Sequence, residues 1–273
     1  MLNFGINLIL VIPVYLKLSH NFLKNKFSEL FLKNFKVTIQ YDGTNYSGWQ
    51  IQENSSSIQQ TITDAAEIIL KEKINLIGSG RTDAGVHAVG QTANFKTEKN
   101  IDPKKFLYSL NSILPSDISV ITIEEAGENF HARFDAKRRS YIYLISTCKS
   151  PFFHPYSFYY GGGIEIKTLN SLSNQIKGKH DFTSFCKKSE EVENKICSVD
   201  TAYWKERRGF IFFLIEGDRF LRGMVRTIAG TLLNAQKKNF GEDYISGIFT
   251  SKDRALAAEA LPAKGLFLYK VKY

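Results

Sequence analysis

Residues that commonly hold metals or disulfides are scarce in this sequence of 273 amino acids. It has three cysteines and five histidines, and neither the Cys-x-x-Cys nor the His-Glu-x-x-His spacing occurs. Those spacings are typical of metal sites, and a disulfide scaffold needs many paired cysteines. We therefore exclude a zinc ribbon and a disulfide scaffold, predict that no metal is bound, and expect a reducing compartment, the cytoplasm.

Long apolar runs are also lacking. The apolar segment from Phe4 to Leu16 is interrupted by Pro13 and has about half the length needed to span a bilayer. No lysine or arginine precedes it, and residues 1–34 contain no arginine, so neither a secretory signal nor a mitochondrial presequence fits. We expect residues 1–34 to be an extension unrelated to the rest, or a start codon assigned too early. An interfacial helix is the alternative, and no membrane partner is expected.

Acidic residues are outnumbered by basic ones, 27 to 36, which gives a net charge of +9 and a pI of about 9.3. Four lysines and one glutamate in residues 1–34 account for part of this excess. A basic chain with 13% aromatic residues favours a polyanionic partner, nucleic acid first and an anionic membrane second.

Hydrophobic periodicity predicts an α+β protein. Residues 35–41 alternate as a half-buried strand does, and apolar residues at helical spacing follow Ser57. The first half reads strand, helix, strand, strand, helix, strand, which is the ferredoxin-like order with helices on one face of an antiparallel sheet. The expected strands are 35–41, 74–77, 91–95 and 118–123, and the expected helices are 57–73 and 103–115.

The second half has a similar order of elements but no detectable sequence repeat. We expect it to begin with a strand at 140–145 and to end with a strand at 265–273. Between them the pattern predicts helices at 168–177, 220–237 and 253–261, and a hairpin of 196–206 with 210–217 that turns at 207–209. Fold alone does not give function.

A glycine-rich loop, Gly78 to Ala88, carries the residues best suited to chemistry. Three glycines surround Arg81, Thr82 and Asp83, so the backbone can turn tightly. A nearby arginine favours the ionised carboxylate, which can then act as nucleophile or general base. The loop lacks the lysine of a P-loop and the third glycine of a dinucleotide fingerprint. A purely structural turn is the equal alternative.

A second candidate region is the basic run His131 to Arg139, with four lysines and arginines directly before the strand that holds Tyr141 and Tyr143. Cations beside aromatic rings suit phosphate contacts and base stacking. The alternative is a solvated charged face.

Several segments in this order resemble the TruA family of tRNA pseudouridine synthases. The resemblance runs from about Phe35 to Tyr273. It includes Tyr41-Asp-Gly-Thr with Gly48-Trp-Gln, Gly80-Arg-Thr-Asp-Ala-Gly-Val-His-Ala88, His131-Ala-Arg-Phe, Tyr141-x-Tyr143, His180-Asp-Phe, Phe220-Leu-Arg-Gly-Met-Val-Arg226 and Gly265-Leu-Phe-Leu.

The resemblance implies isomerisation of uridine to pseudouridine at positions 38 to 40 of the tRNA anticodon stem-loop. It implies no cofactor, a homodimer, and two ferredoxin-like subdomains, 35–139 and 140–273, that share one mixed, mostly antiparallel sheet with a central cleft. By position, Asp83 matches the catalytic aspartate and Tyr141 the tyrosine that stacks on the target base. Arg81 matches a residue that orients the aspartate and holds the extruded nucleotide, Arg226 one that pairs with the aspartate, and Leu266 one that lines the pocket.

Two other functions fit parts of the sequence. A non-catalytic RNA-binding protein built from two RNA-recognition-like halves would explain the charge and the aromatic residues, but it leaves Asp83 without a role. A carboxylate-dependent glycosidase would need a second acid flanking the bond, and the loop offers only Asp83.

Overall fold

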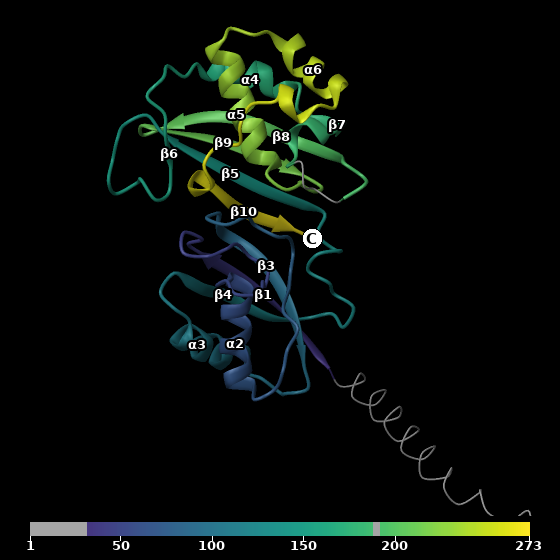
Figure 1. Ribbon diagram of the computed structural model, residues 1–273. Helices are drawn as coiled ribbons and strands as arrows, with labels where there is room; N and C mark the ends of the chain where they lie inside the picture. The colour runs from purple at the N-terminus through teal and green to yellow at the C-terminus, as the bar shows by residue number, and fades with distance from the viewer. Residues whose placement is uncertain (1–31, 188–191) are drawn as a thin grey trace, which may run out of the picture.

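A mixed, mostly antiparallel β-sheet organises the computed structural model, which describes residues 32–187 and 192–273. The strand order is β4-β1-β3-β10-β5-β9-β8-β7, with β2 paired to β3 and β6 to β5. The strands are β1 Lys33–Tyr41, β2 Ile77–Gly78, β3 His87–Thr97, β4 Ile118–Ala126, β5 Arg138–Ser146, β6 Phe158–Tyr159, β7 Gly178–Asp181, β8 Ile196–Arg207, β9 Phe210–Gly217 and β10 Leu266–Lys272. The last strand, β10, lies in the middle, between the N-terminal and the C-terminal strands (Figure 1).

Five α-helices accompany the sheet in the described ranges. They are α2 Ile58–Leu70, α3 Pro103–Ile113, α4 Ile166–Asn174, α5 Met224–Lys237 and α6 Glu242–Ser251. Helices α2 and α3 lie beside the N-terminal strands, and α4, α5 and α6 lie beside the C-terminal ones (Figure 1). This arrangement confirms the predicted α+β class and the single mixed, mostly antiparallel sheet.

One row of buried residues shows that the core side is continuous across both halves. Cross-strand partners point to the same face of a sheet, and each residue of the row pairs with the next. The row is Tyr41, Ala88, Leu268, Tyr141, Ile215 and Ala202, and all six residues are less than 9% exposed. In the adjacent row on the other face, Phe267, Ile142, Leu214 and Tyr203 are half-buried or exposed, whereas the polar His87, which pairs with Phe267, is buried. The hydrophobic core therefore lies on one side of the sheet.

The helices of the first half begin where the sequence predicts them. Ser57 caps α2 by accepting a hydrogen bond from the Gln60 amide, and Asp102 caps α3, with Pro103 in its first turn. The helix α2 ends at Leu70, before the expected Lys73, because Lys71 adopts a left-handed conformation with φ of 56°. Phe106 and Leu110 form the buried face of α3, whereas Ile113 in its last turn is 45% exposed.

The second half corrects two predictions. The helix α5 begins at Met224 and not at Phe220, because Gly223 has φ of 73° and breaks the helical path. Residues 253–261 form only a short 3-10 turn, Arg254–Leu256. The Ala258 amide donates to the Thr231 hydroxyl of α5, and another amide of this segment donates to the Arg226 carbonyl. Backbone amides of this segment therefore donate to α5 and do not form the hydrogen bonds of a separate helix.

The predicted hairpin of β8 and β9 is confirmed. Arg208 and Gly209 form its two-residue turn, both with positive φ, as a tight hairpin turn requires. The N-terminal segment 1–31 lies outside the described residues, so the interpretation of residues 1–34 stays a prediction. No helix within 32–187 or 192–273 combines the length and the apolar character that crossing a bilayer requires.

Candidate active site

The loop that carries Asp83, residues 79–86, leads from β2 into β3 and is called the Asp83 loop below. It forms hydrogen bonds with β1 and with the segment that follows β1. The Trp49 amide donates to the Thr82 carbonyl at 3.1 Å, and the Tyr41 hydroxyl shares a hydrogen bond with the Thr82 hydroxyl at 2.8 Å. Gly85 has φ of 73°, a left-handed conformation that glycine adopts without strain. It allows the Val86 amide to donate back to the Asp83 carbonyl at 3.1 Å. The predicted tight turn is present and is fixed by its neighbours.

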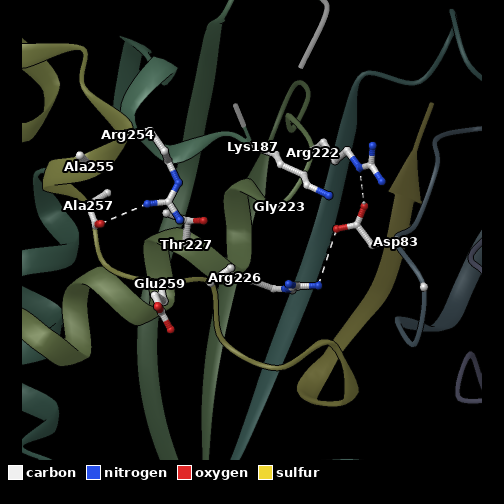
Figure 2. Close-up of a pocket in the computed structure, with 12 residues that line it drawn as sticks. Asp83, Lys187, Arg222, Gly223, Arg226, Thr227, Arg254, Ala255, Ala257 and Glu259 are labelled. Atoms are coloured by element: carbon white, nitrogen blue, oxygen red, sulfur yellow. Dashed lines mark hydrogen bonds and ion pairs between the residues drawn. The ribbon is translucent and has the colours of Figure 1, made fainter. Parts of the chain in front are cut away.

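Two arginines from the other half of the chain meet the Asp83 carboxylate. Arg222 Nε lies 3.5 Å from Asp83 Oδ1, and Arg226 Nη1 lies 3.7 Å from Asp83 Oδ2 (Figure 2). Arg222 precedes α5 and Arg226 is in its first turn, so the non-helical turn at Gly223 directs both side chains to the same carboxylate. The Asp83 side chain is 28% exposed, so solvent and a ligand can still reach it.

A cavity of about 670 Å³ opens beside this carboxylate. Its walls come from the Asp83 loop, the start of α5 and the segment after α6, with Arg254 and Glu259 on the side away from Asp83 (Figure 2). The charged side chains in its lining are four cations, Lys187, Arg222, Arg226 and Arg254, and two acids, Asp83 and Glu259. The volume falls in the range of ordinary ligand pockets, and the excess of cations favours an anionic ligand.

Tyr141 lies on β5, is 8% exposed, and is not among the residues that line the cavity. Burial raises the pKa of its hydroxyl to about 12, the Arg139 guanidinium opposes this, and the Asp83 carboxylate adds to it. The Tyr141 ring packs edge-on against Phe220, with 5.2 Å between ring centroids. Burial also raises the pKa of Tyr41. Both phenols therefore stay neutral near pH 7 and contribute rings and hydroxyl groups rather than charge.

The remaining predicted residues lie apart from the cavity lining. Arg81 is exposed, and its Nε donates to the Gln50 side chain at 3.1 Å. Among the described ion pairs, the cations beside Asp83 are Arg222 and Arg226 and not Arg81. Leu266 is the first residue of β10, is 6% exposed, and pairs with Tyr143.

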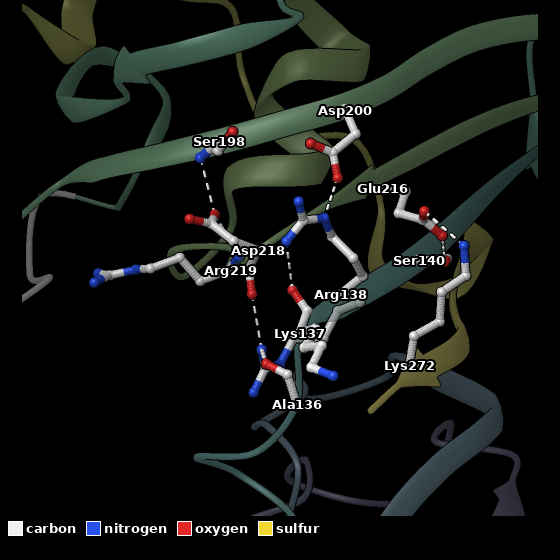
Figure 3. A network of polar contacts seen from close by, with 11 residues as sticks. Ala136, Lys137, Arg138, Ser140, Ser198, Asp200, Glu216, Asp218, Arg219 and Lys272 are labelled. Carbon is white, nitrogen blue, oxygen red and sulfur yellow. Dashed lines mark hydrogen bonds and ion pairs between the residues drawn. The ribbon is translucent and has the colours of Figure 1, made fainter.

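Two residues of the basic run 131–139, Arg138 and Arg139, form ion pairs or hydrogen bonds within the protein. Arg138 forms an ion pair with Asp200 on β8 (Figure 3). The Arg139 guanidinium donates to the carbonyls of Ser79 and Asp218. Lys137 and Arg133 are exposed. Arg138 and Arg139 therefore bind other parts of the protein, and phosphate contacts by the exposed cations of the run stay a prediction.

Sequence reasoning missed three of the cationic residues that line the cavity. The signal for Arg222 was present, since it stands four residues before Arg226 in one of the matched segments. Lys187 and Arg254 carried no such signal, because they reach the cavity only through the packing of distant segments. No group of three His, Cys, Asp or Glu residues suited to a metal ion occurs in the described part of the chain.

Comparison with known proteins agrees with these features. A family model described as tRNA pseudouridine synthase matches residues 37–135 and 172–273. A tRNA pseudouridine synthase A of Brachyspira hyodysenteriae is 41% identical over 240 residues, which cover 86% of this chain and 96% of the relative. One of Clostridium acetobutylicum is 41% identical over 244 residues, covering 89% and 100%. A tRNA pseudouridine synthase A 1 of Protochlamydia amoebophila is 42% identical over 245 residues, covering 88% and 96%.

A solved structure titled Crystal Structure of a Cbf5-Nop10-Gar1 Complex resembles this fold only weakly. It is 12% identical, has a TM-score of 0.31, and the match covers 70% of this chain and 52% of that one. A similarity of this size carries no argument about the site.

Proposed function

Because this chain belongs to the TruA family of tRNA pseudouridine synthases and is an isomerase acting on tRNA, we propose that Asp83 is its catalytic residue and that the targets are uridines 38 to 40 of the anticodon stem-loop. The observation that carries this proposal is the geometry of Asp83. Among the acids of the cavity lining, it alone stands between two arginines, at 3.5 and 3.7 Å.

The reaction needs a carboxylate but no redox partner. The bond between N1 of uracil and C1′ of the sugar breaks, the base turns, and C5 bonds to the same C1′. The proton on C5 is then lost, and N1 gains one, so product and substrate are isomers. Asp83 can attack the sugar, attack the ring, or remove the proton, and each role requires the carboxylate to touch the reacting nucleotide. The family resemblance implies no cofactor for this chemistry.

The target base must leave the helical stack to reach Asp83. Extrusion of a paired base costs a few kcal/mol, which stacking and polar contacts in the pocket offset. We propose that Tyr141 provides the ring under the base and Leu266 an apolar contact beside it. Arg226 would balance the charge of Asp83, and Arg81, exposed on the outer side of the loop, would contact the RNA that surrounds the extruded nucleotide.

Substitution of Asp83 by Asn tests this assignment. Asp83→Asn keeps the size of the side chain and removes the charge, so we expect formation of pseudouridine in tRNA to vanish while tRNA binding persists. Asp64→Asn, the same change at an exposed position of α2, is the control and should retain full activity. An Asp83→Asn variant that still converts uridine would overturn the catalytic role. Pseudouridine mapped only outside positions 38 to 40 would overturn the target assignment.

We also propose a homodimer that covers the helix-free face of the C-terminal strands. This face carries the half-buried or exposed apolar row of Phe267, Ile142, Leu214 and Tyr203. An unpaired apolar surface of this kind favours association. Sedimentation should give twice the mass of one chain, and Leu214→Lys should shift the protein to the monomer.

The cytoplasm is the proposed location. All three cysteines, Cys148, Cys186 and Cys197, are free, as is usual for proteins of a reducing compartment, and tRNA is the substrate of the family.

A further inference from the structure

His87 is the first residue of β3 and follows Asp83 by four positions. It is only 1% exposed. It stands where the two halves of the sheet meet, because β3 and β10 pair in parallel through His87 with Phe267 and through Ala88 with Leu268. A buried histidine at a junction beside the reactive loop has no role in the function proposed above.

Each nitrogen of the His87 ring contacts a different half of the molecule. The Gly43 amide, in the turn after β1, donates to Nδ1 at 3.1 Å. On the other side of the ring, Nε2 donates to the Lys264 carbonyl, just before β10, at 3.2 Å. The ring also stacks on Phe267 with 4.7 Å between centroids. The imidazole therefore connects the turn after β1 to the start of β10.

These contacts require the neutral ring with its hydrogen on Nε2. The Asp42 carboxylate, which accepts from the Thr44 amide and the Tyr156 hydroxyl, also lies 3.0 Å from Nδ1. It would accept from a ring protonated on that nitrogen, so it connects the ring to the same turn. Burial lowers the pKa of His87 more than Asp42 raises it. The titratable residues in contact with the ring are Asp42, Tyr156 and Lys264.

The turn held by His87 lies directly against the Asp83 loop. A Cβ atom on Gly43 would stand 2.0 Å from the Val86 carbonyl, so the two backbones are in close contact. Val86 closes the turn that begins at Asp83. A second approach comes from the Lys264 side, where a Cβ on Gly85 would stand 3.3 Å from the Ala263 side chain. Movement of either segment would therefore shift the backbone that carries Asp83.

We propose that His87 is a positioning residue of the reaction: by joining Gly43 to Lys264 it fixes the Asp83 loop relative to the half of the chain that carries Arg222 and Arg226. The Asp42–Tyr156 hydrogen bond, 2.9 Å long, supports the same turn from the segment before β6. This inference rests on the proposed function of Asp83. It adds that the precision of the site depends on a residue that does not touch the substrate.

Kinetics of His87→Phe provide the first test. Phenylalanine keeps the ring and its stacking on Phe267 but can neither accept from Gly43 nor donate to Lys264. We expect kcat to fall by about 10- to 100-fold, the range that a misplacement of about 1 Å can produce, while the Kd for tRNA changes less than about twofold. His87→Asn, whose side-chain oxygen can accept from the Gly43 amide, should recover about tenfold of kcat.

Hydrogen exchange gives a readout that is independent of activity. Amides of residues 82–86 should exchange at least about tenfold faster in His87→Phe, while those of β8 and β9 stay unchanged. If the wild-type protein makes no pseudouridine, the proposed function fails, yet this exchange result still tests the connection itself.

If His87→Phe does not fold, Tyr156→Phe tests the proposed positioning role through the Asp42–Tyr156 hydrogen bond. It removes one hydroxyl from a side chain that is 39% exposed, and it should lower kcat by about three- to tenfold with an unchanged Kd. The control is Tyr108→Phe, the same change at a residue that is 78% exposed on α3, which should have no effect. Unchanged kcat in both His87→Phe and Tyr156→Phe would overturn the proposal, as would a loss confined to tRNA affinity.

Discussion

Substitution of Arg139 tests which cations of the basic run 131–139 stabilise the fold and which contact RNA. Its Nε and Nη2 donate to the Ser79 carbonyl at 3.2 and 2.7 Å, and Nη1 donates to the Asp218 carbonyl at 2.8 Å. Ser79 starts the Asp83 loop and is 1% exposed, while Asp218 follows β9. The guanidinium thus connects the loop to the C-terminal half. Arg139→Met would keep the apolar stem and remove these three hydrogen bonds, together with those to the nearby carbonyls of Ala136 and Arg133.

The cost can be estimated from these bonds. A hydrogen bond to a charged group contributes about 1.5 to 3 kcal/mol, and an unsatisfied buried carbonyl costs a similar amount. For the two carbonyls of Ser79 and Asp218, the expected loss is therefore about 3 to 6 kcal/mol. Burial lowers the pKa of Arg139, which means that its charge is held at some desolvation cost. Removal of the charge recovers that cost, so we expect a loss near the lower figure, about 3 kcal/mol, from a total stability of about 5 to 15 kcal/mol.

Urea unfolding of the wild type and of Arg139→Met, with ΔG taken from the midpoint and the slope, would measure this loss. Lys137→Met is the matched control, because Lys137 is an exposed cation of the same run. It should change stability by less than about 0.5 kcal/mol. It should also weaken tRNA binding and lower the salt dependence, the slope of log K against log salt, by about one. For Arg139→Met that slope should not change. A stability loss under about 1 kcal/mol together with a lower slope would show that Arg139 contacts phosphate, and the reasoning would be refuted.

Two further predictions concern the turn below the Asp83 loop and the buried tyrosines. Gly43→Ala places a methyl group 2.0 Å from the Val86 carbonyl and should lower the free energy of unfolding in urea by about 3 kcal/mol, the upper end of the usual overpacking cost. Gly127→Ala, with no atom within 4 Å of the added carbon, should change it by less than about 0.5 kcal/mol. Tyr141 keeps its proton to about pH 12 in the folded protein but only to about pH 10 when unfolded. The unfolded chain therefore binds fewer protons in this window, and stability should fall with rising pH by about 1.4 kcal/mol per pH unit for this residue. The slope measured above pH 10 should be smaller by that amount in Tyr141→Phe, and an unchanged slope would contradict the burial argument.

Local sequence patterns predicted the elements that depend on near neighbours. The alternation at 35–41, the cap at Ser57, the Asp102–Pro103 start of α3 and the turn at Arg208–Gly209 all rest on residues within a few positions of each other. Each of these elements is present. The periodicity of a segment and its capping residues reflect the same short-range energetics that fix its conformation.

Long-range partners explain why the predicted helix at 253–261 does not form. Residues 253–261 have the apolar spacing of a helix, but two of their backbone amides bind to α5, at Thr231 and Arg226. The real helix, α6, was not predicted. A sequence pattern cannot report that a distant helix offers better hydrogen-bond acceptors than the segment's own backbone. The division of the chain at 139 and 140 also stays a prediction.

In the candidate site, too, sequence patterns identified residues of local motifs but not contacts made by packing between distant segments. Asp83 and Arg226 could be named because each lies in a segment that resembles a known family. The contact of Arg81 with Gln50 and the approach of Arg222 to Asp83 depend on how loops pack, and no local pattern indicates either. Sequence reasoning thus named the acid and one of its two neighbouring cations, Arg226, but expected Arg81 where the structure has Arg222.

The position of β10 accounts for this dependence on packing. Asp83 belongs to the first half of the chain, and Arg222 and Arg226 to the second. The halves are joined in the sheet where β10 lies between β3 and β5. On the β3 side, the strands pair in parallel through only two residue pairs, at His87 and Ala88. Such a short ladder fixes the angle between the halves weakly, and the side chains of His87, Arg139 and Tyr273 add hydrogen bonds across the same junction. The distance from the carboxylate to the two arginines is therefore a property of the junction, not of the Asp83 loop alone.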